Sequence, residues 1–544
     1  MITLLLVFFP LAAALAAYLA GNNRIIIRVC LALTALLHAG LTFCCLQLPR
    51  EMTSCIWNGQ EWIGLDRTGS LFLVITSLLF LFVTVHTLLW LPAEYRAETK
   101  PAAPGHFAGL QSEHIFIPCM LAFLATMTLV ITSRNFGLLW VAVEATTLVS
   151  APLICFHRSD RSLEAMWKYL LICSVGIGLA LFGTMLMAVS AQSLGHIGMN
   201  MDVLAEHAEK FDLGWFKGAF IFILAGYGTK MGLAPFHTWL PDAHSEAPGM
   251  ISALLSGSLL NCSFLGIIRF WQITPEALKP FCGNLLTALG ILSLVIAAFF
   301  IIRQSDFKRM LAYSSVEHMG LAALLWGRGL EDYSLIHLCG HSVIKMTLFL
   351  VAGNILLAYG TRSVSAVGGM FGRLPRTAVL WMLAILLICG TPPSPLFVTE
   401  YLLVRESGFL LGAVVLLLLF AVFAGMSMAC LKMCMGTPGE VNPSDARARD
   451  TERLWLVPAA AVAVALIGGL VLTFILNQGE LCYGYRISET EQRRLRADDL
   501  PAVSALCGIP QDADRRRPHA RLARRLVLCH AEGGGSHASD RGSD

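Results

Sequence analysis

Eight of the titratable side chains inside the apolar stretches of this sequence, where charge is costly, are candidates for an ion path. They are Glu144, Lys230, Glu317, His318, His337, His341, Lys345 and Glu400. A charged residue at the centre of a bilayer costs about 3 kcal/mol on insertion scales, so these residues are expected to face protein or water and to have partners. Carboxylates, imidazoles and amines can accept and release protons. Their types therefore indicate proton transfer within a membrane.

Lys230 follows an apolar run that opens near Trp215, about 15 residues or roughly 22 Å along a helix. Gly232 and Pro235 follow closely, and proline removes a backbone donor and clashes with the preceding turn, so we expect a helix break beside the lysine. A broken helix beside a buried charge suggests an ion path. The alternative is a lysine that snorkels to an interface or forms a structural ion pair. The polar segment 237–248 is expected to be a loop at the membrane surface.

Glu144 lies near the middle of the apolar run 136–156. A carboxylate at that depth is a natural partner for Lys230, because each charge stabilises the ionised form of the other. The pair would then be part of the ion path. A fixed structural ion pair is the alternative.

Titratable residues also cluster in two later apolar runs. The sequence KRMLAYSSVEHMG buries Glu317 beside His318. His337, His341 and Lys345 recur at every fourth position, so they share one helix face. Histidine donates and accepts protons near neutral pH, and a desolvated lysine can release its proton. The stripe therefore favours a proton relay over packing alone.

A second helix break is expected in the run 377–404. GTPPSPLFVTEYLL places Pro392, Pro393 and Pro395 in mid-span, and Glu400 follows them. In the first break the charge precedes the proline, and in the second the charge follows. This mirrored order suggests inverted repeats, an arrangement found in transporters.

The composition requires a membrane protein. The chain has 544 residues, of which 56% are apolar and 14% charged, and its mean hydropathy is +0.68. We therefore expect an all-α polytopic membrane protein with about fourteen spans. These spans are residues 2–20, 25–47, 70–91, 113–132, 136–156, 167–190, 215–239, 249–271, 281–302, 310–327, 333–359, 377–404, 408–431 and 454–476.

The predicted spans, numbered as helices 1–14 in chain order, and the two predicted breaks divide the chain into five parts. They are residues 1–112 with helices 1–3, residues 113–271 as a first inverted repeat of helices 4–8 with helix 7 broken, residues 281–431 as a second repeat of helices 9–13 with helix 12 broken, residues 454–476 as helix 14, and residues 477–544 as a polar, basic tail expected to be disordered.

Basic residues in the short loops indicate the orientation. Arg24, Arg158, Arg161, Lys308 and Arg373 lie in loops that share one side if the N-terminus is outside. Because cytoplasmic loops carry an excess of lysine and arginine, we expect a multi-pass protein of the inner, cytoplasmic membrane of a prokaryote with its N-terminus outside.

Several other functions are not indicated. The 16 cysteines lie mostly singly in apolar runs, where cysteine behaves as a small hydrophobe, so neither a metal site nor a redox centre is expected in this chain. The sequence has no glycine-rich phosphate loop. A net charge of +3 indicates no nucleic-acid partner.

Five motifs resemble one family of membrane proteins. They are WVAVEATTL, GTKMGLAPFHTWLPDAHSEAP, KRMLAYSSVEHMG, GHSVIKMTLFLVAGNIL and GTPPSPLFVTEYL. In this order they resemble the antiporter-like subunits of respiratory complex I, of Mrp-type cation/proton antiporters and of membrane-bound group 4 nickel-iron hydrogenases. The resemblance covers residues 60–475. Within the family, the adjacent Glu317 and His318, the sequence LLSGSLLN and the length are most similar to component F of hydrogenase-4, from a formate hydrogenlyase type of complex.

The resemblance implies roles for individual residues. Glu144 and Lys230 match a coupled pair in the family, and Lys345 matches its central lysine. Glu400 matches the terminal residue of a polar axis that runs across the membrane.

Position 261 departs from the family pattern. Many relatives carry a lysine where this chain has Asn261. The step between Lys230 and Lys345 would then use water, His341 or His318.

These features predict a proton-translocating subunit of a membrane-bound hydrogenase or a complex I-like oxidoreductase. The expected partners are other membrane subunits and a peripheral hydrogenase or dehydrogenase arm, which would hold a nickel-iron site and iron-sulfur clusters. The chain itself would bind lipid, protons and possibly Na⁺, and no cofactor. The alternatives are a subunit of a Mrp-type Na⁺/H⁺ antiporter and a non-conducting structural anchor, although an anchor has no reason to keep such costly buried groups.

Overall fold

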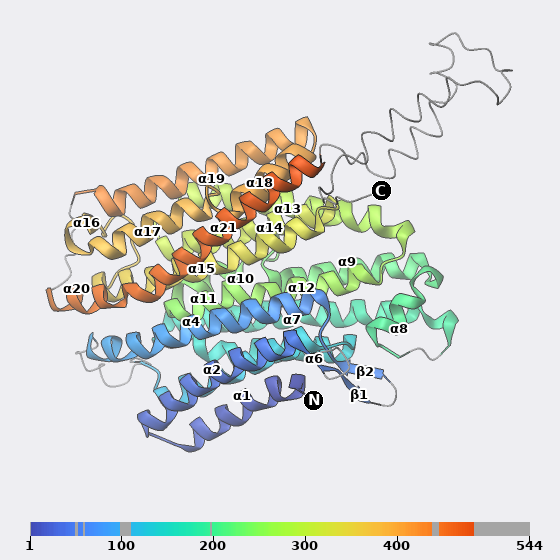
Figure 1. Ribbon diagram of the computed structural model, residues 1–544, viewed down its shortest axis with the longest axis horizontal. Coiled ribbons are helices and arrows are strands. Elements are labelled where there is room, and N and C mark those ends of the chain that lie inside the picture. Colours follow the sequence, from blue (N-terminus) through green and yellow to red (C-terminus); the bar gives the residue numbers. More distant parts are fainter. Residues whose placement is uncertain are drawn as a thin grey trace, which may run out of the picture. The chain divides into compact units, whose positions relative to one another are not determined.

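The described residues of the unit Met1–Phe474 form a bundle of long helices that lie side by side, with a short β-hairpin (Figure 1). The computed structural model describes residues 2–48, 53–57, 60–97, 110–195, 198–437 and 445–483. From residue 484 onward, the predicted tail lies outside the described residues.

The first part of the bundle contains the antiparallel strands β1 and β2 and the helices up to α10, which directly follows the first break. The bounds are α1 (Ile2–Leu19), α2 (Arg24–Gln47), β1 (Cys55–Trp57), β2 (Gln60–Ile63), α4 (Arg67–Ala97), α5 (Glu113–Thr132), α6 (Phe136–Ile154), α7 (Asp160–Ser190), α8 (Met201–Glu206), α9 (Leu213–Met231) and α10 (Trp239–Glu246).

The second part of the bundle begins after α10. The bounds are α11 (Gly249–Leu254), a π-helical turn (Leu255–Leu259), α12 (Leu260–Gln272), α13 (Lys279–Ile302), α14 (Phe307–Gly327), α15 (Glu331–Tyr359), α16 (Met370–Arg373), α17 (Pro375–Ile388), α18 (Pro395–Glu406), α19 (Phe409–Met435), α20 (Asp445–Glu452) and α21 (Leu456–Tyr483).

The all-α membrane fold is confirmed. Eleven of the described helical segments are long and apolar enough to cross a membrane. Of the other three predicted spans, 215–239 corresponds to α9 and the break that follows it, 310–327 to α14, and 377–404 to α17 plus α18. The count of about fourteen spans and the inverted repeats stay predictions. Helix α21 continues to Tyr483, beyond the predicted end of helix 14 at residue 476.

The first predicted break is present between α9 and α10. Helix α9 ends at Met231, and Gly232 adopts the left-handed conformation that glycine tolerates (φ 82°). The prediction of a surface loop over residues 237–248 was wrong. Trp239 to Glu246 form the short helix α10, and most of its side chains are buried. Polar residues such as Asp242 made this segment look like a loop, although its apolar residues insert into the bundle.

The second predicted break is present between α17 and α18. Helix α17 ends at Ile388, and Gly390 is left-handed (φ 65°). Pro395 begins α18, where its missing N–H costs nothing, and the Ser394 side chain caps the helix by accepting from the Leu396 N–H at 3.2 Å.

The interior of the bundle is formed by α15 and by the span that contains α11 and α12. The apolar segment of the α11–α12 span is buried along its full length. Its π-helical turn inserts one extra residue immediately before α12. Asn261 is the second residue of α12, so this turn sets the direction of its side chain.

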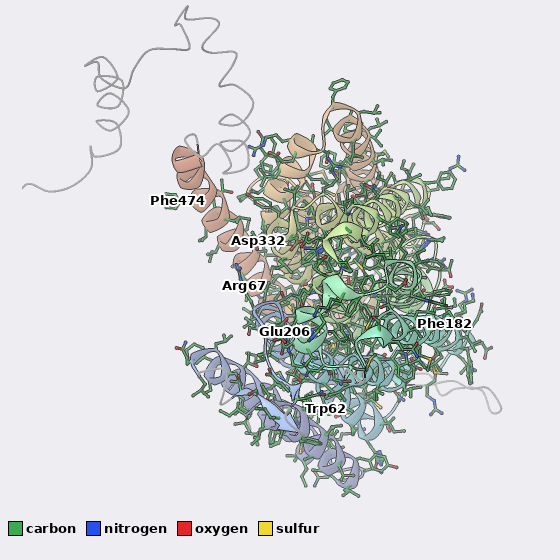
Figure 2. The ribbon with its side chains drawn as sticks, turned by 90° about the vertical axis from the view of Figure 1, so that its right-hand side faces the viewer. Trp62, Arg67, Phe182, Glu206, Asp332 and Phe474 are labelled. Atoms are coloured by element: carbon green, nitrogen blue, oxygen red, sulfur yellow. The ribbon has the colours of Figure 1, made fainter. Side chains whose placement is uncertain are left out.

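A paired ion cluster lies at the end of the bundle that carries the hairpin, which we call the hairpin end. Figure 2 looks along the helices with Trp62 of β2, Arg67 and Asp332 labelled. Asp66, just before α4, lies 3.5 Å from Arg269 and 3.4 Å from Arg134. Burial alone would raise the pKa of Asp66, but the two arginine charges outweigh it and hold this pKa below its usual value.

Candidate functional site

Lys230 lies in the last turn of α9 and is fully buried. Its Nζ donates to the Tyr169 hydroxyl of α7 at 2.6 Å and to Thr147 Oγ1 of α6 at 2.8 Å. The Tyr169 hydroxyl also lies 2.7 Å from Ser150 Oγ. The lysine is therefore solvated by hydroxyl groups from the two helices that pack beside it.

Glu144 lies one turn before Thr147 on α6. Its Oε1 accepts from Ser174 Oγ at 2.7 Å, and its Oε2 has no hydrogen-bond partner within the described part of the chain. Among the described residues, no ion pair within 4.0 Å joins it to Lys230. The fixed structural pair considered from the sequence is thus absent, and the two charges interact through space. A change in the protonation of either residue therefore breaks no direct ion pair between them.

The exposure of α6 explains why Glu144 is only half-buried. Val141 and Leu148, one turn before and one turn after it on the same face, are 51% and 59% exposed. Glu144 therefore lies beside a face of the bundle that is open to lipid or to a neighbouring subunit.

Lys345 of α15 is the fully buried lysine of the second half. Its Nζ donates to the Leu311 carbonyl at 2.7 Å and to Ser314 Oγ, both on α14. Glu317 lies one turn further along α14 and is 3% exposed. Its Oε2 has no partner among the residues described. Like Lys230, Lys345 is held by neutral groups.

Three histidines gather beside Lys345. His318 Nδ1 of α14 lies 3.2 Å from His337 Nε2 of α15, and His337 Nδ1 lies 2.8 Å from Thr399 Oγ1 of α18. The ring of His341 lies 5.4 Å from that of His318, and within the described chain neither of its nitrogens has a partner. The predicted stripe on α15 is therefore completed by groups from α14 and α18.

Glu400 lies beside these histidines on α18. Its carboxylate packs against Gly390 in the second break, where a Cβ would collide with it, and its Oε1 has no partner within the described residues. Ligand atoms of His318, His337 and Glu400 all lie within 4.8 Å of one another, so these three residues could hold a metal ion. The structure thus brings six of the eight predicted residues together and places Glu144 and Lys230 in a separate pair.

Asn261 lies between the two groups. Its Nδ2 donates to Ser342 Oγ of α15 at 2.8 Å and to the Gly257 carbonyl at 2.9 Å. Ser342 directly follows His341 in the chain. The position at which the resemblance predicted a lysine is therefore occupied by a neutral, hydrogen-bonded amide.

The sequence reasoning missed two buried residues, His244 and Lys308. His244 of α10 stacks on Phe349 at 4.8 Å, and neither ring nitrogen has a partner among the described residues. Lys308 of α14 is fully buried and donates to the carbonyls of Ser245, at 3.1 Å, and Ala247. His244 lies within electrostatic range of both Lys308 and Lys345. The sequence analysis missed His244 because it lies in a segment that was predicted to be a surface loop. It missed Lys308 because this residue was interpreted as a basic loop residue at the start of a span.

An open polar cavity lies above Lys308, at the end of the bundle opposite the hairpin. Its volume is about 600 Å³. It is lined by residues that include Glu94, His157, Ser245, Glu246, Asp306 and Arg362. We call this end of the bundle the cavity end. Lys308 therefore bonds to the Ser245 backbone that lines the cavity and lies between it and His244.

Comparison with known proteins agrees with this architecture. A family model described as NADH:quinone oxidoreductase/Mrp antiporter, TM, matches residues 133–427. A hydrogenase-4 component F homolog of Methylacidiphilum infernorum is 38% identical over 336 residues, which cover 59% of this chain and 70% of that protein.

Two solved structures share the fold. One is from the membrane-bound sulfane sulfur reductase, an archaeal respiratory membrane complex, with a TM-score of 0.72 and 20% identity over 87% of this chain and 95% of that chain. The other is from the Mrp complex of Dietzia sp., with a TM-score of 0.72 and 18% identity over the same shares. From the family match and the 38% identical relative, the chain belongs to the transmembrane family of NADH:quinone oxidoreductase and Mrp antiporter subunits.

Proposed function

We propose that this chain is the proton-translocating membrane subunit of a membrane-bound hydrogenase or formate hydrogenlyase type of complex, or of a complex I-like oxidoreductase. One observation carries the proposal: Lys230 and Lys345 are fully buried and are bonded to hydroxyl and carbonyl groups instead of counter-charges. An ammonium group held in this way can lose its proton without leaving an unpaired carboxylate at contact distance. A non-conducting anchor would gain nothing from such costly groups.

The proton enters the second half from the cavity end. Lys308 and His244 lie between the polar cavity and Lys345. From Lys345 the proton passes to Glu317 and the three histidines and then to Glu400. Movements of side chains and intervening water would close the gaps, since several of these polar atoms have no partner within the described residues.

The Glu144–Lys230 pair sets the charge state of the first half. Because Glu144 lies beside an exposed face of α6, a charge that appears on a neighbouring membrane subunit would change its interaction with Lys230. Electron transfer in a peripheral arm, carrying a nickel-iron site and iron-sulfur clusters, would supply that change. The similarity to a hydrogenase-4 component F homolog supports this assignment.

A Mrp-type Na⁺/H⁺ antiporter subunit is the second candidate. The family model includes Mrp antiporters, and the fold matches that of a chain in a Mrp complex. Purification of the tagged chain from its native membrane separates the two candidates. Recovery of a nickel-iron hydrogenase subunit with iron-sulfur proteins supports the hydrogenase complex, whereas sodium-dependent transport by small membrane subunits alone supports the antiporter.

We propose that the chain lies in the inner membrane of a prokaryote with its cavity end in the cytoplasm and its N-terminus outside. Arg158, Arg161, Arg309 and Arg362 gather near the cavity end, as expected for cytoplasmic loops. A reporter fused after α1, active only on one side of the membrane, tests this orientation.

The variant Lys230→Ala tests the function itself. It should abolish proton translocation by the assembled complex while the hydrogen or quinone chemistry of the partners continues. Lys217→Ala is the matched control, because Lys217 lies on the same helix, over the ring of Phe281 at 5.6 Å, away from the path. Full translocation by Lys230→Ala would disprove the proposal.

A further inference from the structure

The ligand atoms of His318, His337 and Glu400 all lie within 4.8 Å of one another, close enough to converge on one metal ion after small side-chain shifts. The three residues come from α14, α15 and α18, and all three are buried. The facing nitrogens of the two histidines are 3.2 Å apart. In tetrahedral zinc sites, where each nitrogen is about 2.0 Å from the metal, two ligand nitrogens lie roughly 3.3 Å apart. The pair therefore has the spacing that a shared zinc ion requires.

The hydrogen bonds of His337 direct a lone pair into the cluster. The Thr399 hydroxyl donates to the Leu396 carbonyl at 2.9 Å, so its oxygen accepts from His337 Nδ1–H at 2.8 Å. Neutral imidazole carries one proton, which leaves Nε2 of His337 as the acceptor. Ligand histidines in metal sites characteristically donate their other N–H to a nearby oxygen in this way.

His318 can adopt the matching tautomer. Its ring also interacts with the backbone carbonyl of Ile388, which can accept a hydrogen bond from the N–H of the ring nitrogen that faces away from His337. In the other tautomer, Nδ1–H of His318 donates a hydrogen bond to His337 Nε2 at this distance of 3.2 Å. With the proton on the nitrogen that faces away, Nδ1 of His318 instead presents a second lone pair to the same point, where a cation can bind both nitrogens.

Glu400 supplies the negative charge. Its Oε1 is buried and has no partner within the described residues. His341, whose two nitrogens also lack partners there, or a water molecule can provide a fourth ligand. Two histidines, one carboxylate and an open fourth position form a typical zinc ligand set.

We propose that His318, His337 and Glu400 bind one divalent transition metal ion, best fitted by Zn²⁺. Binding depends only on these side chains and not on the proposed function. A consequence that does rest on the proposed function is inhibition, because a bound ion would occupy the groups that pass the proton from Lys345 to Glu400.

The first test measures binding of zinc chloride to the purified complex that contains the full chain. Equilibrium dialysis followed by metal analysis should give one more zinc per complex for the wild type than for His337→Gln. Glu400→Gln should weaken that binding by at least about 10-fold. His38→Gln is the matched control, because His38 is also buried but is bonded to Ser77 and Thr128 elsewhere. Equal zinc binding by wild type and His337→Gln would overturn the proposal.

A second variant tests the orientation of His337. Thr399→Val keeps the volume of the side chain and removes the oxygen that accepts from His337 Nδ1–H. Loss of such an orienting oxygen should lower the zinc affinity by about 10- to 100-fold. An unchanged affinity would contradict the site.

X-ray absorption at the zinc edge of the wild-type complex keeps the test independent of mutant folding. The zinc taken up should have nitrogen and oxygen ligands that include two imidazoles. Sulfur ligands, for example from Cys389, would overturn the proposal. Zinc that binds as expected in a complex without proton translocation would leave the metal site standing and refute the proposed function alone.

Discussion

Charged side chains are buried in two different ways at the hairpin end and in the middle of the bundle. At the hairpin end, Asp66 lies between Arg134 and Arg269, and Arg269 also donates to the Val130 carbonyl at 2.8 Å. In the middle, the hydrogen-bond partners of Lys230 and Lys345 within the described chain are hydroxyl and carbonyl groups. The first cluster contains opposite charges in contact, and the second contains charges held apart.

The contrast distinguishes a structural use of buried charge from a functional one. Opposite charges in contact hold each other ionised, so a proton cannot leave or arrive without breaking the cluster. Charges held by neutral groups can change protonation while the fold stays intact. We therefore expect mutations at the hairpin end to affect assembly, and mutations in the middle to affect transport.

Lys345→Met should have the largest effect on transport and little effect on assembly. Methionine keeps the length of the side chain but cannot carry a proton, so translocation should fall to the background of membranes without the complex. The measurement is proton uptake by vesicles that contain the intact complex. Lys432→Met is the control, since Lys432 lies exposed at the end of α19. Loss of the assembled complex in Lys345→Met would instead show that this buried charge is structural, like the cluster at the hairpin end.

Arg269→Met should have the opposite pattern. Arg269 is fully buried, and removing one partner of a buried ion pair costs about 3–5 kcal/mol. The detergent-solubilised complex should melt at a lower temperature and accumulate less, while the fraction that assembles still translocates protons. Arg67→Met, which removes an exposed partner of Asp332, should change the melting temperature little. An unchanged melting temperature in Arg269→Met would show that the cluster is not structural.

Asn261→Leu should have an intermediate effect on transport. The amide bonds to Ser342 between the two groups of titratable residues, and loss of one hydrogen bond of about 1 kcal/mol corresponds to a roughly 5-fold lower rate. Ser342→Ala should have a similar effect, and the double variant should be no slower than either single one. Additive effects would mean that the contact itself does not matter.

Asp66→Asn should have the smallest effect, visible in the pH dependence of stability. The folded-state pKa of Asp66 is lowered, so its ionisation stabilises the fold above the unfolded value of about 3.9 and this contribution is lost as the pH falls through the folded pKa. Melting temperatures of the wild type should therefore fall more steeply than those of Asp66→Asn below about pH 4. Parallel curves would contradict the assignment.

The apolar runs and the prolines were sufficient to predict most of the fold. Pro235 and the prolines of GTPPSP each remove a backbone donor, so the two breaks could be located before the structure was known. Trp239 to Glu246 could not be predicted in the same way. This segment is too short and too polar for a periodic signal, and packing against the bundle keeps it helical.

The site could be predicted only as a set of residue types. The depth of Lys230 and the stripe on α15 follow from spacing within one helix. The contact of His318 with His337, and the hydroxyls of Thr147 and Tyr169 around Lys230, depend on helix packing and have no local signal. The proposed metal site could not be predicted from the sequence for the same reason, because its three candidate ligands come from three helices.

The π-helical turn at Leu255–Leu259 has a consequence for how this span can evolve. On one side of it, Gly249 approaches Gly353 of α15 so closely that a Cβ would meet the backbone, and on the other Asn261 bonds to Ser342 of the same helix. Deleting one residue in the turn would restore a regular α-helix and rotate one contact about 100° away from the other. A single-residue insertion or deletion in this span would therefore separate its two contacts with α15, whereas a volume-conserving substitution elsewhere in the span would keep both.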